Sequence, residues 1–263
     1  MASVFFRFLR KHAAAIIYLI LLALSLPAIW YSVRTPFALI DDYSAYLWLH
    51  AIGKGDFSGV RSIWFSDIRF RPTFDLYNLV TWFVWGDQFA LHHLTRLALK
   101  FISGICAVQT IRLWFPPARE KFNLPAFVFC CLFFFWPNNP EARLAPQETL
   151  LVFFLSLLLW GYSLALRKHA GDIGANPYVY GLVLLSFAFL GGSKEPAIAV
   201  LAVFLGLFIW QGIRSPRRLL LLVPFLLIFF FNISRILAVQ ANGGYGAAKT
   251  TPEVILTNLK WVN

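Results

Sequence analysis

Seven long apolar runs constrain this chain more than any other feature of its sequence. They cover residues 13–33, 91–115, 122–136, 150–166, 178–190, 197–211 and 219–239. A helix that crosses a membrane needs about 20 mainly apolar residues, so each run predicts a spanning helix, although the third, fifth and sixth are short. With 59% apolar and only 13% charged residues, a soluble fold of 263 residues could not bury the apolar surface. The predicted fold class is therefore all-α, a multi-pass transmembrane helix bundle with about seven spans.

The charges between these runs predict the orientation of the bundle. Cytoplasmic segments of membrane proteins carry an excess of Lys and Arg. If the N-terminus is cytoplasmic, the segments on that side hold eleven cations and two acids, which is +9 of the net charge of +11. We therefore expect a cytoplasmic N-terminus. Because the positive charge follows the membrane sides, we expect anionic headgroups rather than nucleic acid as its partner.

The longest segment between spans, residues 34–90, lies on the outer side in this arrangement. Its stretches 43–52 and 74–85 are rich in Trp, Tyr and Phe and are long enough for helices. Such stretches suit helices that lie in the membrane interface, with their aromatic rings at the headgroups. We expect one transmembrane module over residues 1–239. Residues 240–263 would form an outer segment that starts a further element.

Charged residues near the outer side of the predicted spans are the candidates for chemistry. Asp41 and Asp42 directly follow the first span, where two adjacent acids are costly unless they are solvated or paired. A solvated helix end explains the pair as well as a catalytic carboxylate does. Arg69 and Arg71 alternate in an extended segment before Pro72, so both guanidinium groups would point the same way and could bind one phosphate. Contact with lipid headgroups is the alternative for this pair.

Further charges lie inside or between the later spans. His93, Arg96 and Lys100 recur at three and four residues and so share one helix face, where they would bind an anion or extend to the membrane surface. Lys194 and Glu195 lie in a very short turn between two apolar runs, either as a functional pair or as a turn that neutralises itself.

Two other candidates complete this set. Arg235 lies within the last run, and a charge at that depth indicates a function. Glu141, in the loop between the third and fourth spans, could equally be a solvated acid.

Several of these residues belong to motifs that follow one another in a familiar order. The motifs are Asp41-Asp42-Tyr43 after the first span, Arg71-Pro72 before the aromatic segment, His92-His93 at the second span, Pro140-Glu141 in the loop before the fourth span, and Ser193-Lys194-Glu195 after the fifth. In this order and spacing the chain resembles the GT-C superfamily of polyprenyl-phosphate-sugar glycosyltransferases. The likeness is greatest to the protein O-mannosyltransferase branch, including its transmembrane and tetratricopeptide type.

The resemblance implies an inverting glycosyltransferase at the outer face of the membrane. Asp41 or Asp42 would accept the proton of an acceptor hydroxyl as the hydroxyl attacks the anomeric carbon. The leaving polyprenyl phosphate would be stabilised by cations, for which the candidates are Arg69, Arg71, Arg96, Lys100, Lys194 and Arg235. His93, Glu141 and Glu195 would position the acceptor or orient those cations. The cations would remove the need for a metal cofactor, with a carboxylate-bound divalent ion as the less favoured alternative.

The expected partners are therefore a polyprenyl-phosphate-linked sugar, membrane lipids, and a saccharide, lipid glycan or protein that accepts the sugar. The expected location is the inner (plasma) membrane of a bacterium. A flippase or transporter of lipid-linked saccharides would use the same cations, but transporters usually contain paired repeats, and the sequence has none. A third alternative is a non-catalytic or truncated membrane subunit, since the chain ends in what resembles the start of a further element.

Overall fold

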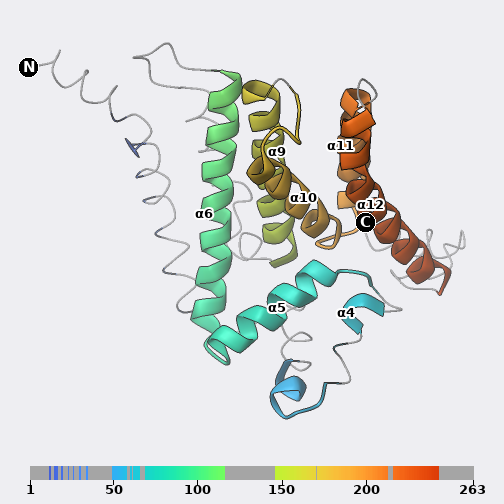
Figure 1. The fold of residues 1–263 in the computed structure, drawn as a ribbon. Helices are drawn as coiled ribbons and strands as arrows, with labels where there is room; N and C mark the ends of the chain where they lie inside the picture. The colour runs from blue at the N-terminus through green and yellow to red at the C-terminus, as the bar shows by residue number, and fades with distance from the viewer. Residues whose placement is uncertain are drawn as a thin grey trace, which may run out of the picture.

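The computed structural model describes residues 49–57, 60, 62–65, 69–115, 146–169, 171–212 and 216–242, together with single positions among residues 12–34. Every labelled element within these residues is a helix, which confirms the all-α prediction for this part of the chain (Figure 1). The helices are α4 (Ser62–Phe65), α5 (Pro72–Trp85), α6 (Phe89–Trp114), α9 (Pro146–Lys168), α10 (Pro177–Gly191), α11 (Ala197–Gly212) and α12 (Pro216–Ala241).

Five of the seven apolar runs are confirmed as helices, namely α6, α9, α10, α11 and α12. Three of these helices are long and apolar enough to cross a membrane, over Phe89–Trp114, Glu148–Lys168 and Arg218–Ala241. Helices α10 and α11 are apolar but shorter, as their sequences predicted. Such helices are those of a membrane protein. The run 122–136 lies outside the described residues and the run 13–33 is described only at single positions, so the seven-span bundle stays a prediction.

Residues at the helix ends explain where α5 and α10 begin and end. Both helices start with a proline at the first helical position, where the missing N–H is not needed. The side chain of Asn176 also accepts hydrogen bonds from the backbone N–H groups of Tyr178 and Val179 and so caps α10. Gly86, with a φ of +52°, ends α5 and turns the chain toward α6.

The core lies between α9, α10, α11 and α12 and is built largely from aromatic rings. Phe208 contacts four rings, those of Tyr162, Phe187, Phe204 and Phe225, with ring centroids 5.0 to 6.3 Å apart. Phe187 of α10 lies edge-on to Phe225 at 5.2 Å. These contacts join α9 to α12 through the two short helices.

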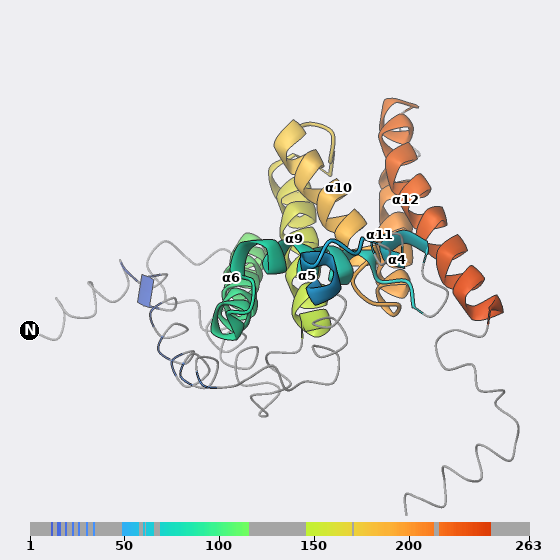
Figure 2. The ribbon, with the colours of Figure 1, turned by 90° about the horizontal axis from the view of Figure 1, so that it is seen from below.

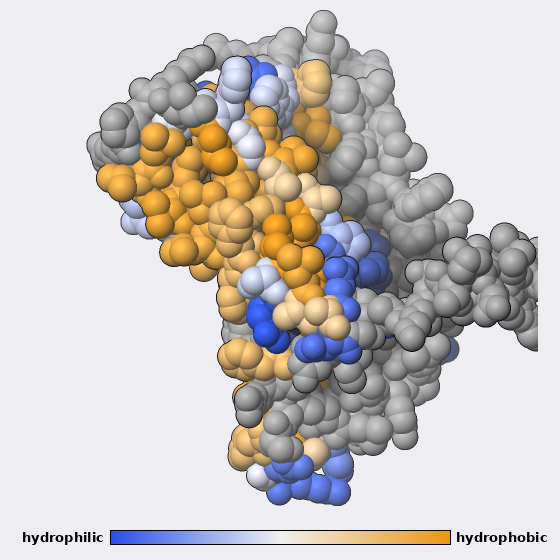
Figure 3. All heavy atoms as spheres, turned by 90° about the vertical axis from the view of Figure 1, so that its right-hand side faces the viewer, coloured by the Kyte–Doolittle hydropathy of each residue, from blue (hydrophilic) through white to orange (hydrophobic). Residues whose placement is uncertain are grey.

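The outer surface of α11 and α12 is apolar. Figure 3 shows apolar residues gathered over the side of the molecule that carries these helices. The exposed side chains include Val203, Leu207 and Trp210 on α11 and Leu220, Leu227 and Phe230 on α12. Such a continuous apolar face is the surface that lipid tails cover in a membrane protein.

Helix α5 lies across one end of the bundle instead of running along it. Figure 1 shows α5 starting beside the lower end of α6 and passing below α9 and α10, and Figure 2 looks at this end directly. Helix α5 begins two residues before the predicted stretch 74–85, and its place inside the membrane interface stays a prediction. The other predicted stretch, 43–52, is described only from Leu49, where a short helix runs to residue 53.

The opposite end of the bundle carries cationic residues that the charge analysis assigns to the cytoplasm. Arg218 of α12 pairs with Asp172 of the α9–α10 turn at 3.2 Å. The guanidinium carbon of Arg167 lies 4.3 Å from the ring centre of Trp114, the last residue of α6. Both the separation of charge between the two membrane sides and the orientation of the bundle stay predictions.

Candidate site at the α5 end of the bundle

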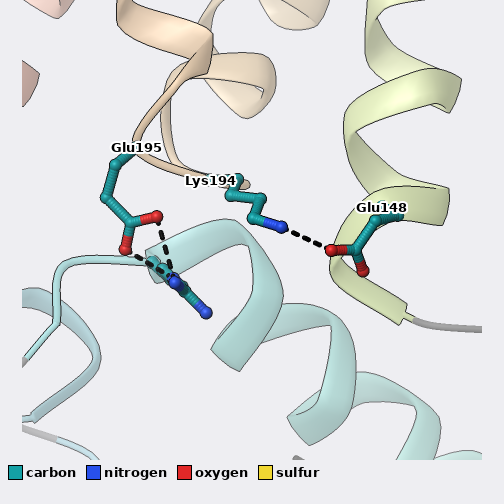
Figure 4. A network of polar contacts seen from close by, with 4 residues as sticks. Glu148, Lys194 and Glu195 are labelled. Carbon is teal, nitrogen blue, oxygen red and sulfur yellow. Dashed lines mark hydrogen bonds and ion pairs between the residues drawn. The ribbon is translucent and has the colours of Figure 1, made fainter. Parts of the chain in front are cut away.

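Two ion pairs connect three elements at the α5 end. Arg71, directly before α5, pairs with Glu195 through two hydrogen bonds, from Nε to Oε1 at 2.6 Å and from Nη2 to Oε2 at 3.0 Å. Lys194 of the same α10–α11 turn pairs with Glu148 in the first turn of α9 (Figure 4). Lys194 and Glu195 are adjacent, yet each forms an ion pair with a residue from a different element. The alternative in which these two residues neutralise each other within the turn therefore does not describe this pair.

The two ion pairs differ in their exposure to solvent. The side chains of Arg71 and Glu195 are 11% and 20% exposed, whereas those of Lys194 and Glu148 are 29% and 48% exposed. A two-point contact that is largely shielded from water is strong and geometrically fixed, whereas a pair in contact with water contributes little. Arg71–Glu195 is therefore the structural pair, and Lys194–Glu148 is the pair that another ion can exchange.

Backbone contacts hold α5 against the α10–α11 turn beside these pairs. The N–H of Thr73 donates to the carbonyl oxygen of Gly192 at 3.0 Å, and the Thr73 hydroxyl donates to the carbonyl oxygen of Phe189 at 2.8 Å. A Cβ atom on Gly192 would lie 2.5 Å from Thr73 Oγ1, closer than real Cβ atoms approach. The absence of a side chain at Gly192 therefore permits the close approach that positions Arg71.

Arg235 reaches the segment before α5 from the last helix. Its guanidinium carbon lies 5.3 Å from the ring centre of Phe65 and 5.9 Å from that of Phe70, the residue next to Arg71. Phe70 is buried and also lies edge-on to Phe231 at 5.8 Å. Within the described part of the chain Arg235 forms no ion pair, and its Nε is buried without a hydrogen-bond partner. Aromatic faces attract a guanidinium but do not neutralise its charge, so Arg235 keeps its positive charge for an anion.

Asp75 is a titratable residue of this site that the sequence reasoning missed. It lies one turn after Arg71 on α5 and its backbone N–H donates to the carbonyl oxygen of Arg71 at 3.1 Å. Burial raises the pKa of the Asp75 carboxyl from its ordinary value of 3.8 to about 7, against the opposing effect of the nearby Arg71 charge. Arg71 lowers this pKa only in part, since its guanidinium is engaged with Glu195.

The remaining cations predicted for phosphate binding occupy different environments. Arg69 is exposed, whereas the side chain of Arg71 is 11% exposed and is held in its ion pair. That both guanidinium groups bind one phosphate stays a prediction. On α6, His93 and Arg96 are buried, each 1% exposed, whereas Lys100 is half-buried.

Three predicted site residues lie outside the described residues. They are the candidate bases Asp41 and Asp42 and the acid Glu141. Their placement relative to the ion pairs stays a prediction. Among the residues that the structure describes, no group of three or more His, Cys, Asp or Glu side chains could hold a metal ion.

Glu148 and Asp75 show what sequence reasoning overlooked. Glu148 belongs to an ordinary first helical turn, where acids are common, and nothing local indicates a partner 46 residues away. Asp75 had a weak signal, because it is an acid within an aromatic segment at a spacing of four from Arg71.

Comparison with known proteins found no match for this chain: no protein-family model, no curated protein and no solved structure is significantly similar to it. The site is therefore interpreted from its own geometry and from the motifs of the sequence.

Proposed function

We propose that the chain is a membrane-embedded inverting glycosyltransferase, which moves a sugar from a polyprenyl-phosphate donor to an acceptor hydroxyl at the outer face of a bacterial plasma membrane. The observation that carries the proposal is the gathering of Arg71, Lys194 and Arg235 at one end of the bundle, from three parts of the chain. A phosphate on a lipid tail lies where the apolar layer meets water, and cations at that level are suited to bind it.

Lys194 and Arg235 are the cations that can receive the phosphate. Lys194 is held by Glu148, which is half exposed, so that a phosphate can replace this carboxylate at little cost in free energy. Arg235 forms no ion pair within the described residues and extends from α12, whose outer side is apolar and exposed. The polyprenyl tail would lie along this apolar surface, with its phosphate at the end that carries Arg235.

Arg71 has a supporting role in this proposal. Because Glu195 engages it at two points, Arg71 fixes the turn that presents Lys194. In this proposal Glu195 orients Arg71.

The proposed reaction is a single displacement. The acceptor oxygen attacks the anomeric carbon, the bond from that carbon to the phosphate oxygen breaks, and its electron pair leaves with the polyprenyl phosphate. The proton of the acceptor hydroxyl passes to a carboxylate, for which the resemblance indicates Asp41 or Asp42. Cations at the phosphate stabilise its developing charge, so that the leaving group needs no proton.

The test is a transfer assay with purified protein in proteoliposomes, using short-chain polyprenyl-phosphate sugars and a panel of acceptors, with the product anomer determined by NMR. We expect inversion, loss of about 10²-fold or more in rate for Lys194→Ala, and no change for Lys168→Ala, an exposed cation at the opposite end of the bundle. Translocation of the donor without transfer would instead establish a transporter. Full turnover by both Asp41→Asn and Asp42→Asn would exclude the proposed bases.

A further inference from the structure

Two polar side chains on α5 take no part in the ion pairs. Asp75 and Asn78 follow Arg71 at four and seven residues, so the three share one side of the helix. At 1.5 Å of rise per residue, Asp75 and Asn78 lie about 6 Å and about 10 Å along the helix axis from Arg71. We refer to Asp75 and Asn78 together as the α5 polar face.

Asn78 offers a hydrogen-bond donor that has no acceptor among the described residues. The residue is 5% exposed, and its Nδ2 has no hydrogen-bond partner within the described part of the chain. The neighbouring Thr81 hydroxyl donates to the backbone carbonyl oxygens of Tyr77 and Asn78, and neither of these bonds uses the Asn78 Nδ2 group. A buried amide donor is costly unless it is paired, so such a donor in a polar face indicates a ligand acceptor.

Asp75 complements this donor. Its half-buried carboxyl makes no side-chain hydrogen bond to the residues described, and the nearby charge of Arg71 is engaged by Glu195. With a pKa raised by burial to about 7, the carboxyl can both donate and accept a hydrogen bond at neutral pH. Asp75 also reaches the surface, so it would be the first of the two residues that a ligand meets.

We infer that the α5 polar face binds the hydroxyl groups of the donor sugar, an inference that rests on the proposed function. A sugar hydroxyl both donates and accepts hydrogen bonds, which matches a carboxyl and an amide donor one turn apart. The sugar is bonded directly to the donor phosphate, and the polar face begins one helical turn from the arginine that anchors the phosphate site. The amide is shielded from solvent, so the ring reaches it by displacing the side chains that cover it.

The test measures how much the sugar adds to binding. The probes are citronellyl phosphate, which has no sugar, and its mannosyl, glucosyl and arabinosyl esters, titrated calorimetrically into the purified full chain. We expect at least one ester to bind about tenfold more tightly than citronellyl phosphate. Asp75→Ala and Asn78→Leu should each reduce that advantage to below about threefold, which corresponds to the loss of one hydrogen bond. Affinity for citronellyl phosphate itself should stay within about twofold in both variants.

Thr81→Val is the matched control on the same helix, because its hydroxyl is already satisfied by backbone oxygens. It should leave the advantage of the ester intact. Asp75 is only half-buried, so Asp75→Ala keeps the test decisive if the variant at the buried Asn78 does not fold. The inference is overturned if no ester binds more tightly than citronellyl phosphate, or if the α5 variants weaken all probes by the same factor, and the proposed function survives both results. If citronellyl phosphate does not bind the wild-type protein, the proposed function fails and the inference fails with it.

Discussion

Removal of the Arg71 guanidinium tests whether the paired turn holds α5 in place. Arg71→Ala removes both hydrogen bonds to Glu195 and leaves that carboxylate, 20% exposed, beside apolar surroundings without its partner. The matched control is Lys194→Ala, which breaks the neighbouring ion pair in the same turn but leaves Glu148 in contact with water.

The expected magnitudes follow from the exposure of each pair. Breaking a fully buried pair costs about 3–5 kcal/mol of unfolding free energy, and an exposed pair contributes about 0–1 kcal/mol. The side chains of Arg71 and Glu195 remain slightly exposed to solvent. We therefore expect the free energy of unfolding to fall by about 2–3 kcal/mol for Arg71→Ala and by less than about 1 kcal/mol for Lys194→Ala. Arg71→Lys should recover only part of the loss, because an ammonium cannot form the two-point contact.

The assay is reversible unfolding of the purified protein in mixed micelles with increasing SDS, followed by the fluorescence of its Trp residues. A double-mutant cycle with Glu195→Gln isolates the pair itself and should give a coupling free energy of about 1–3 kcal/mol. Equal losses for Arg71→Ala and Lys194→Ala, or a coupling near zero, would refute the assignment of Arg71–Glu195 as the structural pair.

Three further predictions address the close approach, the buried acid and the orientation. Gly192→Ala should lower the unfolding free energy by about 1–3 kcal/mol, because its Cβ atom would collide with Thr73. Gly181→Ala, whose Cβ atom would meet open space, is the control and should not destabilise the protein in thermal unfolding. Folding raises the pKa of Asp75 from 3.8 to about 7, so its contribution to the free energy of unfolding should be largest near pH 4 and be lost as the pH rises toward 7. Measured by unfolding at several pH values, this fall in stability should be smaller in Asp75→Asn. After replacement of the native cysteines, Tyr178→Cys, exposed beside the α9–α10 turn, should react with a membrane-impermeant thiol reagent only from the cytoplasmic side of vesicles, and reaction from the outer side alone would reverse the topology.

The helices of the bundle were predictable because their signals are local. An apolar run bounded by Pro and Gly or by charged residues sets both the type and the ends of a spanning helix, as the agreement of α10 with residues 178–190 illustrates. The start of α5 at Pro72 likewise follows from the conformational preference of proline at the first turn.

The contacts of the site were less predictable because they join distant parts of the chain. Arg71 and Glu195 are 124 residues apart, and Lys194 and Glu148 are 46 apart. The sequence could indicate that Lys194 and Glu195 were unusual in so short a turn, but only the packing of α5 and α9 on the two sides of that turn determines that each residue has its own partner. The burial that shifts the pKa of Asp75 is also a property of the packed helices rather than of the α5 sequence.

The central claim is that the α5 end of the bundle binds a lipid-linked phosphate. The most direct measurement is the dissociation constant of citronellyl phosphate for the wild-type protein, for Lys194→Ala and for the distant control Lys168→Ala, at low and at high salt. We expect the wild-type protein to bind citronellyl phosphate saturably and more weakly at high salt. Binding should be about tenfold weaker in Lys194→Ala and unchanged in Lys168→Ala. Equal affinities for all three proteins, or no saturable binding by the wild type, would contradict the central claim.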